Sequence, residues 1–187
     1  MDVKMAESKI ANHELAVAVQ FDVFNKDQVK QEVSQADLIV SMLPASFHIH
    51  VIEEAINQKK NVVTPSYISP EVKALDSAAK EAGVLVMNEL GVDPGIDHMS
   101  AMKLINEIKE DGGEILNFES FTGGLVAPDS DNNPWNYKFT WNPRNVVIAG
   151  QGGSAKFIEE NQFKYIPYNK LFRRTEFIDI DGFGKFE

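Results

Sequence analysis

The chain has 187 residues, of which 43% are apolar, 25% charged and 10% aromatic, and its formal net charge is −10. This is the composition of a folded globular protein, and it excludes the disordered, collagen-like and coiled-coil classes. The acidic balance argues against a nucleic-acid partner, because no net positive field attracts a phosphate backbone.

The sequence offers little for a metal or a membrane. It has no cysteine, which excludes disulfides, thiolate metal sites and cysteine nucleophiles. His48 and His50 lie two residues apart on an expected helix and do not share a face, so we expect no metal site. Residues 1–9 are polar, and no stretch approaches the roughly 20 apolar residues of a membrane span. We expect a soluble cytoplasmic protein with no membrane partner.

Strand and helix patterns alternate through the first half of the chain. Strands are predicted over 15–24, 38–43, 61–64 and 84–87, with helices over 26–34, 47–58 and 70–82 between them. The run 38–43 is continuously apolar, which is typical of a parallel strand buried on both faces. Ser69 and Pro70 fit the cap and first position of the third helix, and Gly83 fits its end. This alternation predicts βαβ units and a parallel sheet, in which ligands bind at the carboxyl ends of the strands.

The pattern changes after the fourth of these strands. The predicted elements beyond it are a helix over 97–110, a strand over 114–121, a long irregular segment over 122–153 and strand pieces over 163–187. Irregular segments of this length are usually functional when they are ordered. Arg144, Arg173 and Arg174 are candidates for recognising carboxylates, although surface ion pairs are the simpler explanation for each. We therefore predict two domains, residues 1–96 and 97–187.

Two of the predicted strands end in motifs that carry hydroxyl groups. Ser41-Met-Leu-Pro44 leads into a helix, whose free backbone N–H groups are suited to a ribose or phosphate. A plain loop with a helix-capping serine explains the same residues. Thr64-Pro-Ser-Tyr67 also follows a strand and offers hydroxyls to a polar ligand, whereas Tyr67 could equally cover the edge of the core.

The densest run of polar chemistry is NELGVDPGIDH, which follows the fourth predicted strand. Gly91 and Gly95 allow the backbone to approach a ligand closely. Pro94 holds Asp93 extended, which fixes the direction of its carboxylate. Asp97 is explained better as a helix cap than as a ligand of a substrate.

Four strings together resemble the saccharopine dehydrogenase family, and most closely its NADP-dependent, L-glutamate-forming branch. They are ADLIVSMLPASFH, NVVTPSYISPEVKALDSAAKEAG, MNELGVDPGIDHMSAMKLINEI and FTGGLVAPDSDNNPWNYKFTWNPR. The resemblance implies an oxidoreductase of lysine metabolism that reduces the imine of aminoadipate semialdehyde and glutamate to saccharopine, and catalyses the reverse. It also implies a Rossmann nucleotide-binding domain, followed by an α+β domain that binds the amino-acid substrate and pairs two subunits into a homodimer.

The resemblance assigns residues to a site. Those that match the family's cofactor contacts are Asp22, Val23, Ser41, Leu43, Pro44, Val92 and Pro94, and those that match its substrate contacts are Ser66, Tyr67 and Asp93. Asp93 is the first catalytic candidate, as the charged partner of the substrate amine. Tyr67 is the second, as a hydrogen-bond donor or proton relay. Phe121-Thr122 stands where well-known members carry a cysteine, so a thiol role does not transfer.

The sequence departs from the family at both ends. No GxGxxG phosphate loop is present, so we expect a partial Rossmann-like sheet without its first βα unit, and an incomplete second domain. The chain is then an internal piece of a longer enzyme. NADP is the expected cofactor, although the choice against NAD belongs to the phosphate loop. Two alternatives stay open: an inactive structural or dimerisation module, and a related imine reductase of the carboxynorspermidine type.

Overall fold

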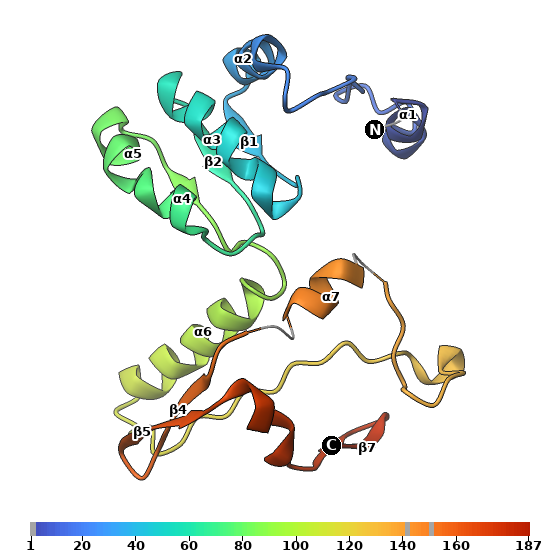
Figure 1. Ribbon diagram of the computed structural model, residues 1–187, viewed down its shortest axis with the longest axis vertical. Helices are drawn as coiled ribbons and strands as arrows, with labels where there is room; N and C mark the ends of the chain where they lie inside the picture. The colour runs from blue at the N-terminus through green and yellow to red at the C-terminus, as the bar shows by residue number, and fades with distance from the viewer. Residues whose placement is uncertain (1–2, 141–142, 150–151) are drawn as a thin grey trace. The chain divides into compact units, whose positions relative to one another are not determined.

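The computed structural model describes residues 3–140, 143–149 and 152–187 and divides into two compact units, Met1–Asn117 and Phe118–Glu187 (Figure 1). The first unit holds a three-stranded parallel sheet, and the second holds two separate antiparallel hairpins. This division separates compact parts of the structure and does not test functional domains. The domain boundary predicted near residue 96 therefore stays a prediction. Residues 1–2, and residues 141–142 and 150–151 of the segment predicted to be irregular, lie outside the described residues.

The sheet of the first unit has the order β1-β2-β3, with β1 at Leu38–Val40, β2 at Asn61–Val63 and β3 at Val86–Met87. All neighbours are parallel, and Val62 on the central strand pairs with Ile39 on one side and Val86 on the other. Each crossover between strands contains helix, as parallel pairing requires. The predicted α/β class with a parallel sheet is therefore confirmed.

The helices of the first unit agree with the sequence pattern in part. They are α1 (Val3–Ile10), α2 (Lys26–Gln35), η1 (Ala45–Phe47), α3 (His48–Asn57), α4 (Pro70–Ala74), α5 (Asp76–Ala82) and α6 (Ile96–Glu110). Ser69 caps α4 by accepting the Val72 N–H, and Gly83 ends α5 with φ 70°. The single helix predicted over 70–82 is divided at Leu75, where ψ is −1°. Helix α1 was not predicted.

Two predicted strands are wrong. Residues 15–24 and 114–121 form no strand, although both segments contain the apolar residues on which the prediction was based. Leu15 is 86% exposed and Leu116 is 88% exposed. A strand is stable only when a neighbour satisfies its backbone N–H and C=O groups, and neither segment pairs with any other strand of the described residues.

The core of the first unit surrounds α3. This helix packs against α2, α4, α5 and β2 (Figure 1), and Ile52 of α3 and Val62 of β2 are both 0% exposed. The strand β1 is covered less completely, since Leu38 is 52% exposed and Val40 is 61% exposed. The prediction that this strand is buried on both faces is therefore wrong within the described residues, because the helices in contact with the sheet leave these side chains uncovered.

The second unit consists of two hairpins and short helices. Its elements are η2 (Pro128–Ser130), α7 (Pro143–Ala149), β4 (Ala155–Glu159), β5 (Gln162–Ile166), η3 (Tyr168–Arg173), β6 (Ile178–Ile180) and β7 (Gly184–Phe186). Glu160 and Asn161 form the turn of the first hairpin, with φ of 52° and 60°, the backbone that a two-residue hairpin turn favours. Strand pieces were predicted from residue 163 onward and are confirmed, whereas β4 was not predicted.

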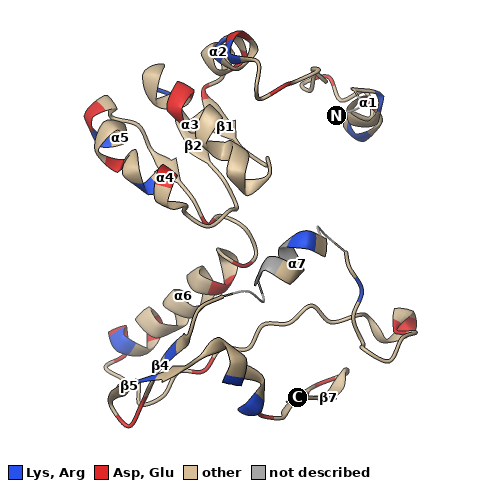
Figure 2. Cartoon of the chain, in the orientation of Figure 1, with Lys and Arg blue, Asp and Glu red and all other residues tan. Residues whose placement is uncertain are grey.

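Acidic and basic residues are mixed along the chain, as expected from a sequence with 28 acidic and 18 basic residues. Figure 2 shows acidic and basic residues interspersed along α2, α4, α5 and α6, so none of these helices presents a purely basic face. Arg174 pairs with Glu159 at 2.6 Å, which confirms the surface ion pair as its local explanation. No helix of the described residues is long and apolar enough to cross a membrane, and among these residues no cluster of His, Asp and Glu is arranged to hold a metal ion.

Candidate functional site

The carboxyl ends of the three parallel strands lie next to one another. Backbone bonds continue the sheet beyond the strands, since the Ser41 N–H donates to Val63 O at 2.9 Å and the Thr64 N–H donates to Met87 O at 3.0 Å. The loops that follow the strands therefore leave the sheet side by side. In parallel α/β sheets, this is the edge at which ligands bind.

A buried histidine joins two of these loops. His48, the first residue of α3, is 2% exposed. Its Nδ1 lies 2.7 Å from the Ser41 hydroxyl and its Nε2 lies 2.8 Å from the Ser66 hydroxyl. The hydroxyl of Thr64, itself 1% exposed, lies 3.1 Å from the same Nε2. Burial lowers the pKa of His48 below its ordinary value, so the neutral ring is favoured, with one nitrogen donating and the other accepting.

Backbone hydrogen bonds join the loop after β2 to the segment after β3. The Glu89 N–H donates to Ser66 O at 3.1 Å, and the Leu90 N–H donates to Thr64 O at 3.1 Å. The carboxylate of Glu89 accepts the Ile68 N–H at 3.3 Å. All three loops at this edge are thus held by hydrogen bonds that cross between them.

The DPG sequence forms a closed turn that requires glycine. The Gly91 N–H donates to Pro94 O at 2.9 Å, the Ile96 N–H donates to Gly91 O at 3.0 Å, and the Asp93–Pro94 peptide is cis. Gly95 has φ 152°, and a Cβ at this position would lie 2.3 Å from Gly91 O. Glycine is needed here because two backbone segments touch, whereas the sequence suggested approach to a ligand.

The interpretation of Asp97 as the cap of the following helix is wrong. The N-cap of α6 is Gly95, and Asp97 lies in the first turn of the helix. Its carboxylate accepts the Gly95 N–H at 2.9 Å and lies 2.8 Å from His98 Nδ1. Asp97 therefore closes the turn from inside the helix, by accepting the N–H of the N-cap residue.

The structure brings the two catalytic candidates together. The Tyr67 hydroxyl donates to Asp93 Oδ1 at 3.4 Å, and both side chains are exposed. Partial burial of the phenol raises the pKa of Tyr67, and the charge and hydrogen bond of Asp93, followed by the charges of Asp97 and Glu89, raise it further. Tyr67 therefore stays protonated at neutral pH and donates a hydrogen bond, beside three carboxylates whose negative charge suits a cationic group.

The other assigned residues lie at different depths around this edge. Ser41 is buried and Leu43 half-buried, while Pro44 is exposed at the start of η1. Val92 is 73% exposed and Pro94 is buried beneath it in the turn. The exposed members are accessible at the surface, and the buried members are packed within the loops.

Asp22 and Val23 lie apart from the group at the strand ends. Asp22 accepts the Phe24 N–H at 3.0 Å and its own N–H donates to Gln28, so it closes the turn before α2. Val23 is part of the hydrophobic core. Within the described residues no hydrogen bond joins either of them to the loops after β1, β2 or β3. Their assignment to the cofactor stays a prediction, as do those of the other site residues.

Sequence reasoning missed His48 as a member of the site, whereas the hydroxyl of Thr64 was noted only as a group that could hold a polar ligand. His48 was considered only as half of a metal-binding pair with His50, which is exposed. The signal that could have found it was its place in the first turn of a helix that follows a strand, with hydroxyl residues at the ends of two neighbouring strands. The helix that connects the two strands begins close to both hydroxyls, so a polar side chain in its first turn can reach them.

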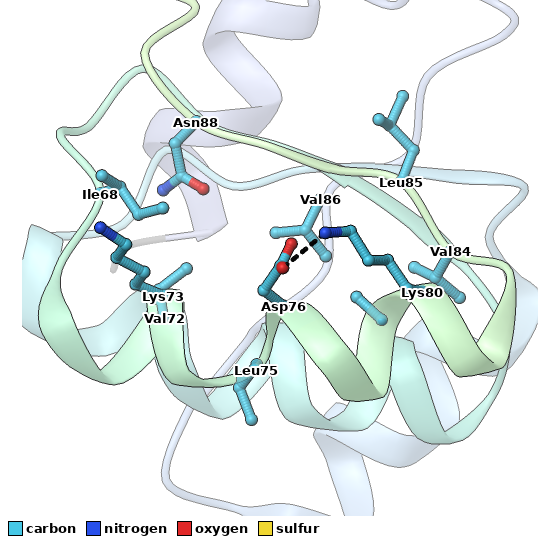
Figure 3. Close-up of a pocket in the computed structure, with 11 residues that line it drawn as sticks. Ile68, Val72, Lys73, Leu75, Asp76, Lys80, Val84, Leu85, Val86 and Asn88 are labelled. Atoms are coloured by element: carbon cyan, nitrogen blue, oxygen red, sulfur yellow. Dashed lines mark hydrogen bonds and ion pairs between the residues drawn. The ribbon is translucent and has the colours of Figure 1, made fainter.

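A separate pocket lies beside β3, and none of the assigned site residues lines it. Figure 3 shows its lining from α4, α5 and the segment around β3, with the ion pair of Lys80 and Asp76 at 2.7 Å. Its volume is about 220 Å³, below the 300–1,000 Å³ or so of typical small-molecule sites. This pocket is too small for a dinucleotide.

Two family models match the chain. The saccharopine dehydrogenase NADP binding domain matches residues 2–87, and the saccharopine dehydrogenase C-terminal domain matches residues 91–187. The chain is similar along its whole length to the apo saccharopine dehydrogenase (L-Glu forming) of Saccharomyces cerevisiae, with a TM-score of 0.83 and 34% identity over 97% of this chain and 40% of that one. The fold that carries the strand-end site is therefore that of the solved enzyme.

Individual relatives agree with the two family models. A saccharopine dehydrogenase [NADP(+), L-glutamate-forming] of Pyricularia oryzae is 46% identical over 147 residues, which are 79% of this chain and 33% of the relative. An alpha-aminoadipic semialdehyde synthase of Arabidopsis thaliana is 41% identical over 155 residues, which are 83% of this chain and 14% of the relative. The chain thus spans about a third of the fungal relative and a smaller share of the plant one.

Proposed function

The chain belongs to the saccharopine dehydrogenase family, and we propose that it acts in NADP-dependent, L-glutamate-forming saccharopine dehydrogenase chemistry. The reaction reduces the imine formed from aminoadipate semialdehyde and glutamate to saccharopine, and runs in reverse. The observation that carries this proposal is the Tyr67–Asp93 hydrogen bond at the carboxyl edge of the parallel sheet, beside loops that the buried His48 ties together.

The exposed carboxylate of Asp93 is the proposed partner of the substrate amine. The hydroxyl of Tyr67 orients it by donating a hydrogen bond. Since the pKa of Tyr67 is raised, the phenol keeps its proton at neutral pH and serves as a hydrogen-bond donor, to Asp93 or to the nitrogen of the substrate. Ser66 precedes Tyr67 directly, and its bond to His48 fixes the start of this segment.

The nicotinamide half of NADP is proposed to bind along the loop Ser41–Pro44 and the turn Val92–Pro94. The fit rests on exposed Pro44 and Val92 and on half-buried Leu43 at the edge of the sheet, where a helix begins behind the loop and offers backbone N–H groups. When bound, the cofactor supplies the hydride that reduces the imine carbon. Asp22 and Val23 are proposed to lie toward the adenine end.

The proposal extends to assembly and location. We propose that the second unit takes part in pairing two subunits, and that the protein works in the cytoplasm on small amino-acid substrates. The support is the exposure of large apolar side chains in the second unit, including Phe163, Phe172 and Phe177, which a second subunit would cover. Sedimentation of the purified protein tests the pairing, and a monomer at all concentrations would contradict it.

The activity is tested by mixing the purified protein with NADPH, glutamate and aminoadipate semialdehyde, and following the loss of NADPH absorbance. We expect oxidation that depends on both amino-acid substrates. Removal of the Asp93 carboxylate by Asp93→Asn should lower the rate about 100-fold or more, the scale of a lost acid–base or charge partner. Asp76→Asn is the matched control, because Asp76 pairs with Lys80 away from the site. No oxidation by the unaltered protein would contradict the proposal.

A further inference from the structure

His48 makes contacts that its place on a core helix does not require. The other buried residues of α3, among them Val51, Ile52 and Ala55, are apolar. His48 alone on this helix is both buried and polar, and its ring lies among the three hydroxyls of Ser41, Thr64 and Ser66. A polar group is buried at little cost only when its hydrogen bonds are satisfied, and here both ring nitrogens are.

The two nitrogens of His48 face different loops. Nδ1 is bonded to Ser41, which follows β1, and Nε2 is bonded to Ser66, which follows β2. In a neutral ring, one nitrogen donates and the other accepts, so the orientation of one hydroxyl depends on that of the other. The rigid ring also links the side chains of the two loops beyond the last backbone bond of the sheet between β1 and β2, in which the Ser41 N–H donates to Val63 O.

Resting on the proposed function, we propose that His48 is a positioning residue that couples the cofactor loop, Ser41–Pro44, to the substrate segment, Ser66–Tyr67. On one side it holds Ser41 at the start of the cofactor loop. On the other it holds Ser66, whose neighbour Tyr67 donates to Asp93. A change on the substrate side is therefore transmitted to cofactor affinity through the imidazole.

Two substitutions of His48 separate its two bonds. In His48→Asn, the side-chain amide occupies the place of Nδ1 and keeps the bond to Ser41. In His48→Gln, the longer side chain reaches the place of Nε2 and keeps the bond to Ser66. We expect each to preserve one loop and release the other. His50→Gln is the matched control, because His50 is exposed two residues further along the same helix.

The test is a double-mutant cycle on NADPH affinity, measured by calorimetry with the full chain. Ser66→Ala should weaken NADPH binding by about three- to tenfold, the effect of one net hydrogen bond, although Ser66 is assigned to the substrate. In the His48→Asn background, where Ser66 has already lost its partner, the same substitution should change the affinity by less than about twofold. An equal effect in both backgrounds, or no effect in either, would overturn the coupling.

A second measurement keeps the test decisive if the His48 variants fail to fold. Nitrogen NMR of the ring should show a single neutral tautomer, and Ser41→Ala should shift both the imidazole resonances and the backbone amide of Ser66 without cofactor present. If these shifts occur and the unaltered chain binds no NADPH, the coupling stands and the proposed function fails. If NADPH binds and the Ser66 amide does not move in Ser41→Ala, the function stands and the coupling fails.

Discussion

The two units of the chain differ in the contacts that stabilise each of them internally. In the first unit, buried side chains link segments far apart in the sequence, as when His48 bonds Ser66, 18 positions away. In the second unit, no described residue is buried, and exposed pairs such as Lys156 over the ring of Phe163, at 4.0 Å, link neighbouring strands of one hairpin. A site that must hold several loops in fixed positions needs the first kind of structure, because buried polar contacts tolerate little displacement.

The largest effect should follow from loss of the core beneath the site. Ile52→Ala removes a side chain of α3 that is 0% exposed, and it should lower the free energy of unfolding by about 2–5 kcal/mol. Urea denaturation followed by circular dichroism measures it. Ile158→Ala is the counterpart in the second unit, where Ile158 is 66% exposed, and should cost no more than about 0.5 kcal/mol. Similar losses of unfolding free energy in the two variants would contradict the difference in burial between the two units.

The next effect concerns the turn that carries Asp93. Gly95→Ala places a Cβ 2.3 Å from Gly91 O at φ 152°, and it should lower the free energy of unfolding by about 1–3 kcal/mol. It should also shift the amide resonances of the turn, which NMR detects. Gly123→Ala in the second unit is the control, since no atom lies within 4 Å of the added Cβ. Unchanged stability in Gly95→Ala would mean that the turn is free to open.

A smaller effect is expected on the ionisation of Tyr67. Asp93→Asn removes the negative charge and replaces the carboxylate by a weaker, neutral acceptor; both features of Asp93 raise the pKa of this phenol, so deprotonation becomes easier and the pKa should fall toward its ordinary value. It should stay above that value, because partial burial is the largest cause of the shift. The absorbance of the phenolate, followed in a pH titration, measures the change. Asp76→Asn should leave it unaltered, and a pKa that rises in Asp93→Asn would contradict the geometry.

The smallest effect should come from an ion pair of the second unit. Arg174→Ala removes the contact with Glu159 at 2.6 Å and the packing of the guanidinium over Phe157 at 4.7 Å. Both charged groups are exposed, so solvent and salt screen the pair. We expect a small fall in Tm at low salt that shrinks further at high salt. The pKa of Glu159, which the Arg174 hydrogen bond lowers, should rise toward its ordinary value. A large, salt-independent loss would sink this description of the second unit.

The sequence predicted well those elements whose cause is local. The parallel sheet, helix α3 and helix α6 follow from apolar periodicity, and α4 follows from the Ser69 cap. Residues 15–24 and 114–121 have equally suitable patterns but form no strand. Whether a segment becomes a strand depends on a partner elsewhere in the chain, and a local pattern carries no information about that partner.

The residues of the site also differ in whether the local sequence could reveal them. Tyr67 and Asp93 could be assigned from motifs at strand ends, and the structure joins them by a hydrogen bond. The role of His48 could not be assigned, because it depends on hydroxyls from two loops that meet only after the sheet forms. Asp97 was misplaced for a related reason, since its carboxylate accepts the N–H of Gly95, a contact that depends on how the turn before α6 folds.

The central claim is that the loops joined by His48 form a cofactor site at the carboxyl edge of the parallel sheet. Calorimetric titration of the chain with NADPH tests it most directly. We expect saturable binding of NADPH that weakens in Ser66→Ala and is unchanged in His50→Gln. Absence of binding by a folded chain, or equal affinity in Ser66→Ala and the unaltered chain, would contradict it.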